Sequence, residues 1–516
     1  MPPGVRTTGG IGREWVGPFS PTTLVEDEAP IQGCSRCGVI GRLIPAYYGP
    51  ELCRGCAHDD ARAFDAEASW PATWWDISLP KHVAVIGPLG LYHLDTLRTH
   101  WGNSIEALGA LAEAFGITQF WVHESALASL GFPREIDTGR RPAPVPHAFC
   151  SQAGDWQSSR PGLKAWGYWW KKGGSGFDLH IPAYRLDHPF AGTGSPLELL
   201  CHVAHFDRAT KGVRWCGSGS ITSDVFLRGQ LGKRAGSSAV PPPVQHRWAL
   251  EEQYSWHRRP GPDEQGFRYV HGLDLNLAYA NAASSLELPT GEPHRVDWPK
   301  VDARVPGVYL FDPGEWPADL PPPWKVNNFY RPEDGSVWVT TPTAERLAQV
   351  GLEPLEGWVW ENHGRHLRGW YEMLRDARAD VLELGGPALD AVKEIARRGL
   401  GRLASEDRTL RGTEYLEDDP LFQPYWNWAV VAETRCRLQR RISELEVKPV
   451  AVDVDCLYFL SSRPSPAYLG ARIGLPMGDG LGQFKAHGTG KAKDAMRVLE
   501  LEDHAQAVAA LRELVK

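Results

Sequence analysis

The sequence predicts a multidomain protein of the α+β class. The chain has 516 residues, enough for about two to four domains. In its C-terminal half, strand-like runs alternate with helices without repeating as βαβ units, which favours an antiparallel sheet. A Gly-, Ser- and Pro-rich linker at 236–243 precedes that half, and a compact cysteine cluster lies near the N-terminus.

Four segments follow from these boundaries. Residues 1–33 are rich in Gly, Pro and Thr, and we expect a poorly ordered, flexible lead-in. Residues 34–60 hold the cysteine cluster, and residues 61–238 have a mixed α/β pattern. Residues 250–516 form the α+β part, in which an antiparallel sheet would carry the site.

Apolar alternation and helical spacing place the individual elements. Before the linker, strands are expected at His82–Ile86 and Phe120–Val122, and helices at Ser104–Phe115, with Ser104 as its cap, and Pro196–Phe206. After the linker, strands are expected at Tyr269–Asp274, Gly307–Phe311, Val337–Thr340 and Val450–Phe459. Long helices are expected at Arg365–Leu384, Ala388–Leu403, Trp426–Leu445 and Ala505–Leu514.

Composition excludes several classes of protein. With 42% hydrophobic and 23% charged residues, the chain matches ordinary globular proteins. A formal net charge of −8 argues against a histone-like coating role but leaves room for a local basic channel. No apolar run approaches the ~20 residues of a membrane span, and Met1–Arg6 opens no secretory signal. We therefore expect a cytoplasmic protein with no membrane partner.

Four of the nine cysteines have the spacing of a structural zinc ribbon. Cys34 and Cys37 form one CxxC pair, and Cys53 and Cys56 form a second. Two such pairs supply four thiolates to one tetrahedral Zn²⁺ ion, and such a closed site serves folding or docking, with DNA or a protein as the docked partner. Four unligated thiols are the alternative. The odd total in a chain without a signal speaks against a disulfide framework.

Carboxylates lie at the tips of two apolar runs. Asp274 ends the first run, and Asp453 and Asp455 lie two apart in the second. On one strand this pair would share a face, and buried carboxylates need a counter-charge, most often a divalent metal. If Asp274 meets the pair, the chain has a two-metal site for phosphoryl transfer. Taken singly, a strand-end cap or a surface charge is the simpler interpretation.

Between the two runs lies a basic helix. Lys393 and Arg397 are four residues apart on one face, and Arg398 and Arg402 extend the positive surface. A solvated charged face is the simpler interpretation of this helix alone. Beside a metal-carboxylate cluster, such a helix can bind a triphosphate.

In this order the motifs resemble a known family. The segment "DLNLAYANA" resembles the first palm motif of family B DNA polymerases, "VDVDCLYF" their Asp-Thr-Asp motif, and "VKEIARRGLGRLAS" their fingers motif. "LGQFKAHG" resembles the Lys-containing segment that touches the primer. The resemblance covers about Glu251 to Lys491 and is greatest to the compact branch of protein-primed phage, linear-plasmid and mobile-element enzymes. It implies a palm with an antiparallel sheet and helical fingers.

The resemblance implies a role for each matching residue. Asp274 and Asp455 would hold two Mg²⁺ (or Mn²⁺) ions, with Asp453 in support and the carbonyl of Leu275 completing the metal shell. Tyr279 would lie under the incoming sugar and exclude a 2′-hydroxyl. A core aromatic is the alternative for Tyr279.

Two lysines complete the implied site. Lys393 would contact the triphosphate, together with Arg397, and Lys485 would contact primer phosphate. The alternative for Lys485 is a solvated surface lysine. Arg397 stands where the family has Asn, and Leu400 stands where it has Tyr.

Other family parts are reduced. No convincing Asp-x-Glu exonuclease motif is present: Asp76 is the candidate for its Asp, and no Glu follows two residues later. We expect no proofreading, although residues 61–238 can keep a degenerate exonuclease-like fold as a scaffold. The sequence after Lys491 is short, so we expect a small or missing thumb.

The sequence therefore predicts a DNA-templated DNA polymerase that replicates a plasmid, phage or integrated element. Its partners would be a DNA primer–template, dNTPs and, in a protein-primed scheme, a terminal or initiator protein. Two other hypotheses remain. One is a catalytically weak polymerase-like protein that binds DNA ends or an origin, and the other is a metal-dependent nuclease, which leaves Lys393 and Tyr279 unexplained.

Overall fold

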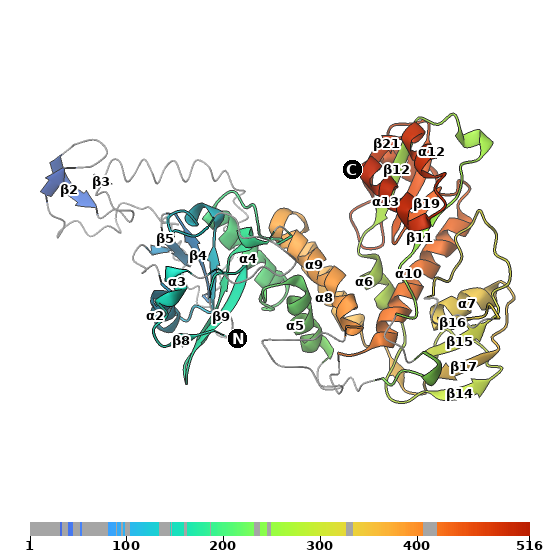
Figure 1. The fold of residues 1–516 in the computed structure, drawn as a ribbon, viewed down its shortest axis with the longest axis horizontal. Helices are drawn as coiled ribbons and strands as arrows, with labels where there is room; N and C mark the ends of the chain where they lie inside the picture. Colours follow the sequence, from blue (N-terminus) through green and yellow to red (C-terminus); the bar gives the residue numbers. More distant parts are fainter. Residues whose placement is uncertain are drawn as a thin grey trace, which may run out of the picture. The chain divides into compact units, whose positions relative to one another are not determined.

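The computed structural model describes most of the chain after residue 80. These residues are 81–88, 90–93, 96–98, 104–133, 145, 147–158, 162–185, 187–231, 238–244, 249–326, 334–405 and 421–516, with three short strands between residues 31 and 53. The chain divides into two compact units. One is Met1–Arg208 with Gly386–Ala388, and the other is Ala209–Gly385 with Leu389–Lys516 (Figure 1). In this described part, no helix is both long and apolar enough to cross a membrane.

The first unit contains a mixed seven-stranded sheet in the order β6-β5-β4-β7-β10-β9-β8. β7 pairs in parallel with both β4 and β10, and the remaining pairs are antiparallel. The strands are β4 (Val83–Gly87), β5 (Gly90–His93), β6 (Thr96–Arg98), β7 (Gln119–Val122), β8 (Trp156–Gln157), β9 (Trp166–Lys171) and β10 (Gly176–His180). The helices are α2 (Ile105–Phe115), α3 (Ala148–Ser151) and α4 (Pro196–Ala209).

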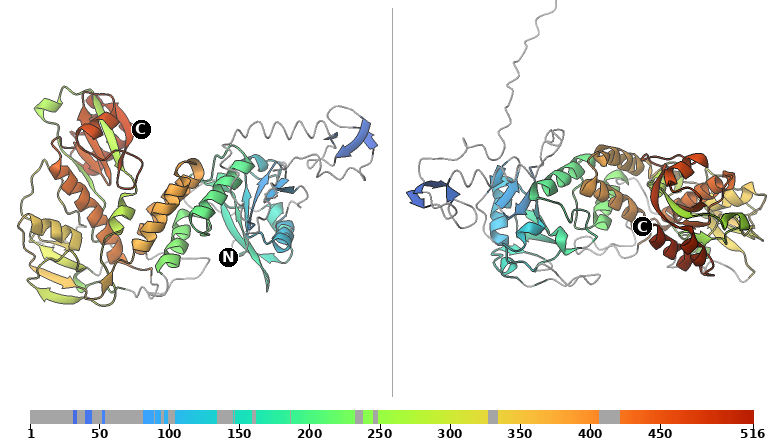
Figure 2. Two further views of the ribbon diagram at one scale, coloured as in Figure 1. Left: turned by 180° about the vertical axis from the view of Figure 1, so that it is seen from behind. Right: turned by 90° about the horizontal axis from the view of Figure 1, so that it is seen from above.

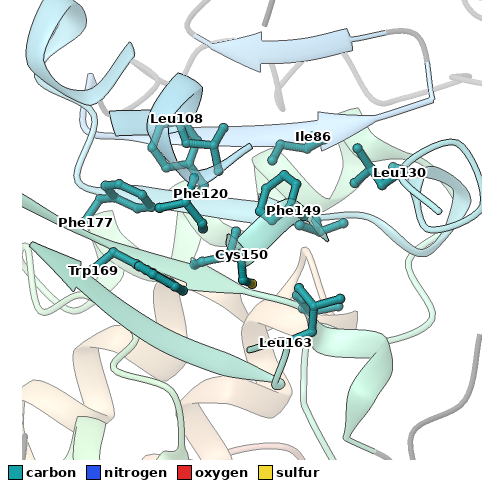
Figure 3. Close-up of a cluster of buried hydrophobic side chains, with 14 of the residues drawn as sticks. Ile86, Leu108, Phe120, Leu130, Phe149, Cys150, Leu163, Trp169 and Phe177 are labelled. Atoms are coloured by element: carbon teal, nitrogen blue, oxygen red, sulfur yellow. The ribbon is translucent and has the colours of Figure 1, made fainter. Parts of the chain in front are cut away.

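The core of this unit lies between α2, α3 and the sheet. Figure 3 shows Leu108, Phe120, Phe149 and Phe177 around Cys150, and all five are buried. The predicted cap of α2 is confirmed, because the Ser104 hydroxyl accepts from the N–H of Ala107 at 3.2 Å. The predicted mixed α/β character of this region is thus observed.

The cysteine cluster is only partly described. A small antiparallel sheet is formed by β1 (Ile31–Gly33), β2 (Ile40–Ile44) and β3 (Leu52–Cys53), so the last three residues of the expected lead-in form a strand. Cys34, Cys37 and Cys56 lie outside the described residues. The zinc site therefore stays a prediction.

The second unit is built on a five-stranded sheet in the order β11-β19-β20-β12-β21, and every pair in it is antiparallel. The strands are β11 (Ser255–His257), β12 (Tyr269–Leu275), β19 (Ala451–Asp453), β20 (Cys456–Ser461) and β21 (Phe484–Lys491). This is the antiparallel sheet that the sequence predicted as carrier of the site.

Helices cover both faces of this sheet. On one face, Leu457 and Phe459 of β20 share a core with α10 (Pro424–Glu444) and α11 (Pro466–Arg472). On the other face, Tyr458 and Leu460 share a core with α12 (Ala492–Val498) and α13 (His504–Val515). The period of two in β20 follows from the pleat of a strand. A sheet buried on both faces explains the continuous apolar run that follows Asp455.

Several of the remaining elements of this unit lie against α10 (Figure 2). The helix contacts α6 and α7, and also β13 and β16. A four-stranded antiparallel sheet has the order β14-β17-β15-β16, and β13 pairs with β18. The bounds are β13 (Leu288–Pro289), β14 (His294–Asp297), β15 (Gly307–Phe311), β16 (Val337–Thr340), β17 (Glu356–Val359), β18 (His363–Gly364), α5 (Gly219–Leu231), α6 (Ala278–Ala283), α7 (Thr341–Gln349), α8 (Arg368–Leu382) and α9 (Gly386–Leu403).

The long helices and most strands of this half agree with the sequence prediction to within a few residues. β15 and β16 have the predicted bounds, and α9 begins two residues before the expected Ala388. Mixed helices and several sheets are thus confirmed. One predicted strand, Val450–Phe459, is wrong, because the chain turns within it at the site described below.

The last helix packs unusually close to β21. A Cβ atom added at Gly488 would lie 1.6 Å from the carbonyl oxygen of Val515, and one added at Gly490 would lie 2.5 Å from that of Leu514. Neither glycine has a positive φ. These two glycines are therefore required by the approach of α13 rather than by the backbone conformation of β21.

We predict that Gly488→Ala lowers the free energy of unfolding by about 1–3 kcal/mol, because the new methyl group meets a main-chain oxygen that must move. Chemical denaturation followed by circular dichroism measures the change. The matched control is Gly266→Ala, whose added Cβ meets nothing within 4 Å. Equal effects of the two substitutions would contradict the close packing of α13.

Candidate active site

The pairing of β12 with β20 brings Asp274 beside the turn that carries Asp455. In this register Asp274 lies opposite Cys456, and the backbone N–H of Leu275 donates to the carbonyl of Asp455 at 3.1 Å. Two carboxylates that are far apart in the sequence therefore meet at one end of the sheet. This is the meeting that a two-metal site requires.

Asp455 lies in a hairpin turn rather than on a continuous strand. β19 ends at Asp453 and β20 begins at Cys456, so Val454 and Asp455 form a two-residue turn. Val454 has a φ of 58°, which tight hairpins need but a β-branched residue disfavours. The prediction of one strand over Val450–Phe459 was wrong because a Val-Asp pair carries none of the usual turn signals.

A second residue with positive φ follows the other carboxylate. Leu277 has a φ of 47°, where the chain turns from β12 into α6. Asn276 holds this turn: its N–H donates to the carbonyl of Gln483 at 3.0 Å, and its side-chain amide to that of Gly478 at 2.9 Å. Such strain persists where surrounding contacts fix the backbone, often at functional sites. The turn places Tyr279 in the first turn of α6.

Two cations neutralise carboxylates of this group. The Lys485 ammonium lies 3.1 Å from Asp274, and β21 places the two residues directly opposite each other. Arg512, near the end of α13, forms an ion pair with Asp453. The Asp453 side chain is 6% exposed and that of Asp274 is 25% exposed. The guanidinium of Arg512 therefore pairs with the more deeply buried carboxylate, Asp453, for which an unpaired charge would cost more.

The environment of Asp455 disfavours its charge. Burial, and next the negative charge of Asp274, raise the pKa of Asp455 from its ordinary 3.8 to about 7, and Asp453 adds to the effect. Lys485 acts in the opposite direction. A carboxylate whose ionisation is disfavoured by a neighbouring carboxylate forms a site whose charge a divalent cation would relieve.

Tyr279 lies near Asp455 and lines a cavity. Burial, followed by the negative charge of Asp455, raises the pKa of Tyr279 above its ordinary range, and a hydrogen bond to Gln253 opposes the shift. The cavity has a volume of about 490 Å³. Its lining residues come from α6, α9, α10 and the segment before β11: Ala249, Glu251, Glu252, Gln253, Tyr279, Arg397, Leu400, Gly401, Asn427 and Val431.

Glu251, which lines this cavity, belongs to a buried ion pair. Glu251 pairs with Arg435 of α10, and its other oxygen accepts from the N–H and hydroxyl of Thr340 and from the hydroxyl of Thr343 at 2.9–3.0 Å. Arg435 also donates to the carbonyl of Pro323 at 2.8 Å. Because both charges are almost fully buried, removing either partner would leave an uncompensated charge.

The predicted nucleotide-binding residues of α9 lie on different parts of that helix. Arg397 lines the cavity together with Tyr279, and its guanidinium forms an ion pair with Glu394. Leu400 also lines the cavity, and its carbonyl accepts from the side-chain amide of Asn427 at 2.9 Å. Lys393 lies one turn earlier and pairs with Asp390 at 3.0 Å.

Sequence reasoning missed two residues of the site, Arg512 and Gln253. Arg512 lies on a helix that carried no motif, and its partner precedes it by 59 residues. Gln253 lies in an irregular segment before β11. Neither position carries a local signal, since both act through contacts that the tertiary fold creates.

The donor set of the site suits a hard metal ion. Among the residues that the structure describes, no group of three or more His, Cys, Asp or Glu side chains converges to hold a metal. A bound ion would therefore rest on Asp274 and Asp455, with main-chain and substrate oxygens completing its shell. Mg²⁺ commonly binds proteins in this way, through one or two carboxylates with water and phosphate oxygens.

Comparison with known proteins gives no family assignment. No protein-family model matches the chain, and no curated protein matches it in sequence. The chain is similar in structure to phi29 DNA polymerase complexed with primer-template DNA and incoming nucleotide substrates, with a TM-score of 0.45 and 12% identity over 76% of this chain and 79% of the other. For phi29 DNA polymerase with single-stranded DNA the TM-score is 0.41, with 13% identity over 76% and 78%.

We predict that Asp455→Asn stabilises the metal-free protein in a pH-dependent manner. The pKa of Asp455 is raised to about 7 in the folded state, so the folded state holds the proton more tightly than the unfolded state. The wild-type free energy of unfolding therefore falls as the pH rises from the ordinary pKa of the carboxyl to about 7. Asparagine carries no charge, so the gain should grow from about pH 5 to about pH 8 and reach about 1–2 kcal/mol for this partly exposed side chain.

Urea denaturation in EDTA at both pH values measures this difference. Asp319→Asn is the control, since Asp319 is exposed in a loop. A gain of the same size at both pH values would contradict the described environment of Asp455.

Proposed function

We propose that this chain is a DNA-templated DNA polymerase that transfers nucleotides with the help of two Mg²⁺ ions. One observation carries the proposal: the fold brings Asp274 and Asp455 together beside a cavity that Tyr279 and Arg397 line. The motif resemblance assigns Asp274, Asp455 and Tyr279 to one site, and Arg397 lies in the segment that resembles the fingers motif. Replication of a plasmid, phage or integrated element is the proposed setting.

Each residue has a defined task in this proposal. Asp274 and Asp455 hold the metal ions, which activate the primer 3′-hydroxyl and stabilise the leaving pyrophosphate. Arg397 binds the triphosphate from α9, and Lys393 supplies a second positive charge one turn away. Tyr279 blocks the space that a ribose 2′-hydroxyl would need. The zinc ribbon would dock DNA or a protein partner.

A catalytically weak polymerase-like protein that binds DNA remains a second candidate, because specific contacts favour it. Lys485 and Arg512 neutralise two carboxylates, and Glu394 holds Arg397. If these ion pairs persisted when DNA bound, the protein would bind primer–template through its other basic residues without extending the primer.

We predict that the wild-type protein extends a DNA primer with dNTPs and Mg²⁺, and that Asp274→Asn and Asp455→Asn each reduce the rate by about a thousandfold. Loss of a metal ligand removes several kcal/mol of transition-state stabilisation. Gel-resolved primer extension measures the rates, and Asp319→Asn should match wild type. No extension by wild type with Mg²⁺ or Mn²⁺, while it binds the same DNA, would reject the polymerase and favour the second candidate.

We predict that Tyr279→Ala lowers the preference for dNTPs over rNTPs by about ten- to hundredfold, because the ring no longer fills the space beside the sugar. The ratio of kcat/KM for the two nucleotides measures the preference. Tyr279→Phe is the matched control and should keep the preference, since it retains the ring. If alanine and phenylalanine give the same ratio as wild type, Tyr279 belongs to the core and does not select the sugar.

A further inference from the structure

The contact between Lys485 and Asp274 occupies the proposed metal site with a cation of the chain itself. The ammonium lies 3.1 Å from an oxygen of Asp274, and the two residues are directly opposite in the pairing of β12 with β21. One side chain of the protein therefore already neutralises a carboxylate that is proposed to bind metal.

This ion pair is built differently from that of Arg512. Lys485 is 41% exposed, and β21 is the edge strand of the sheet, so its flexible side chain can move into solvent. Arg512, which is 47% exposed, belongs to α13, whose last turn packs on Gly488, and its partner Asp453 is 6% exposed. The two contacts therefore differ in the carboxylate: Asp274 is 25% exposed, so water or a divalent ion can reach the contact of Lys485 more readily.

A divalent ion and the ammonium compete for Asp274. An ion bound to Asp274 and Asp455 would use the carboxylate oxygens that face Lys485, and the two cations would repel each other at this separation. A nearby phosphate offers the ammonium an alternative partner of the same sign as the carboxylate. Movement of Lys485 from carboxylate to phosphate would free Asp274 for the ion.

We propose that Lys485 is the resident cation of this carboxylate pair and couples metal binding to DNA binding. Without DNA, Lys485 holds Asp274 and weakens the affinity for divalent ions. When primer–template binds, its phosphates draw Lys485 away, and the metal enters. Since coupling between two ligands is reciprocal, the metal also tightens DNA binding by the same factor. This inference rests on the proposed metal site.

The test measures binding of Mn²⁺ alone, with the free ion counted by electron paramagnetic resonance. Without DNA, Lys485→Met should bind Mn²⁺ about fivefold more tightly than wild type, the value of a partly exposed ion pair. Lys485→Arg keeps the charge and should not tighten binding. Lys491→Met removes an exposed lysine of the same strand, away from Asp274, and should match wild type.

A second arm adds a DNA duplex with a recessed 3′ end. This duplex should tighten Mn²⁺ binding by wild type and by Lys491→Met, and the gain should be smaller for Lys485→Met, which has no ammonium to release. Unchanged Mn²⁺ affinity in Lys485→Met would overturn the inference. The proposed function would survive that result if Asp274→Asn still lost Mn²⁺ and primer extension. Absence of Mn²⁺ binding in every protein would reject both proposals.

Discussion

The antiparallel register of β12 against β20 is the constraint on which the candidate site depends. It sets Asp274 opposite Cys456, and therefore next to the turn that carries Asp455. A slip of one residue would turn Asp274 to the other face of the sheet and exchange the faces of the apolar residues that alternate with it. Because both faces of the sheet pack against helices, such a slip would disrupt two cores at once. The packing that holds the sheet therefore also fixes the chemistry at its end.

Charge is distributed around that register in an orderly way. Asp453, the most buried carboxylate, has a guanidinium from a packed helix, and Asp274 has an ammonium from an edge strand. Asp455 lies in the turn after Asp453, and burial and the negative charge of Asp274 raise its pKa. The Asp274 side chain is 25% exposed, so its end of the site is the more accessible to a ligand. Tyr279 and Arg397 both line the cavity.

Much of this half of the molecule could be predicted from the sequence, because helical spacing and apolar alternation are local signals. The predicted meeting of Asp274 with Asp455 is also observed, since motif order carried that information. The hairpin turn was missed because Val454 adopts a conformation that its own side chain disfavours. The partners of Asp453 and Asp274 were missed because packing of α13 and register of β21 are properties of the tertiary fold. Three of the four clustered cysteines lie outside the described residues, and the zinc site rests on their spacing alone.

The position of Arg512 in the chain has a consequence for biosynthesis. Its partner Asp453 is made 59 residues earlier, a delay of about 3–12 s at ordinary rates of translation. During that interval the β19–β20 hairpin exists without the helix that later covers one face of its sheet. Asp453 must then remain hydrated, because burial without a cation is costly. The sheet of the candidate site therefore reaches its final packing only after α13 has been made.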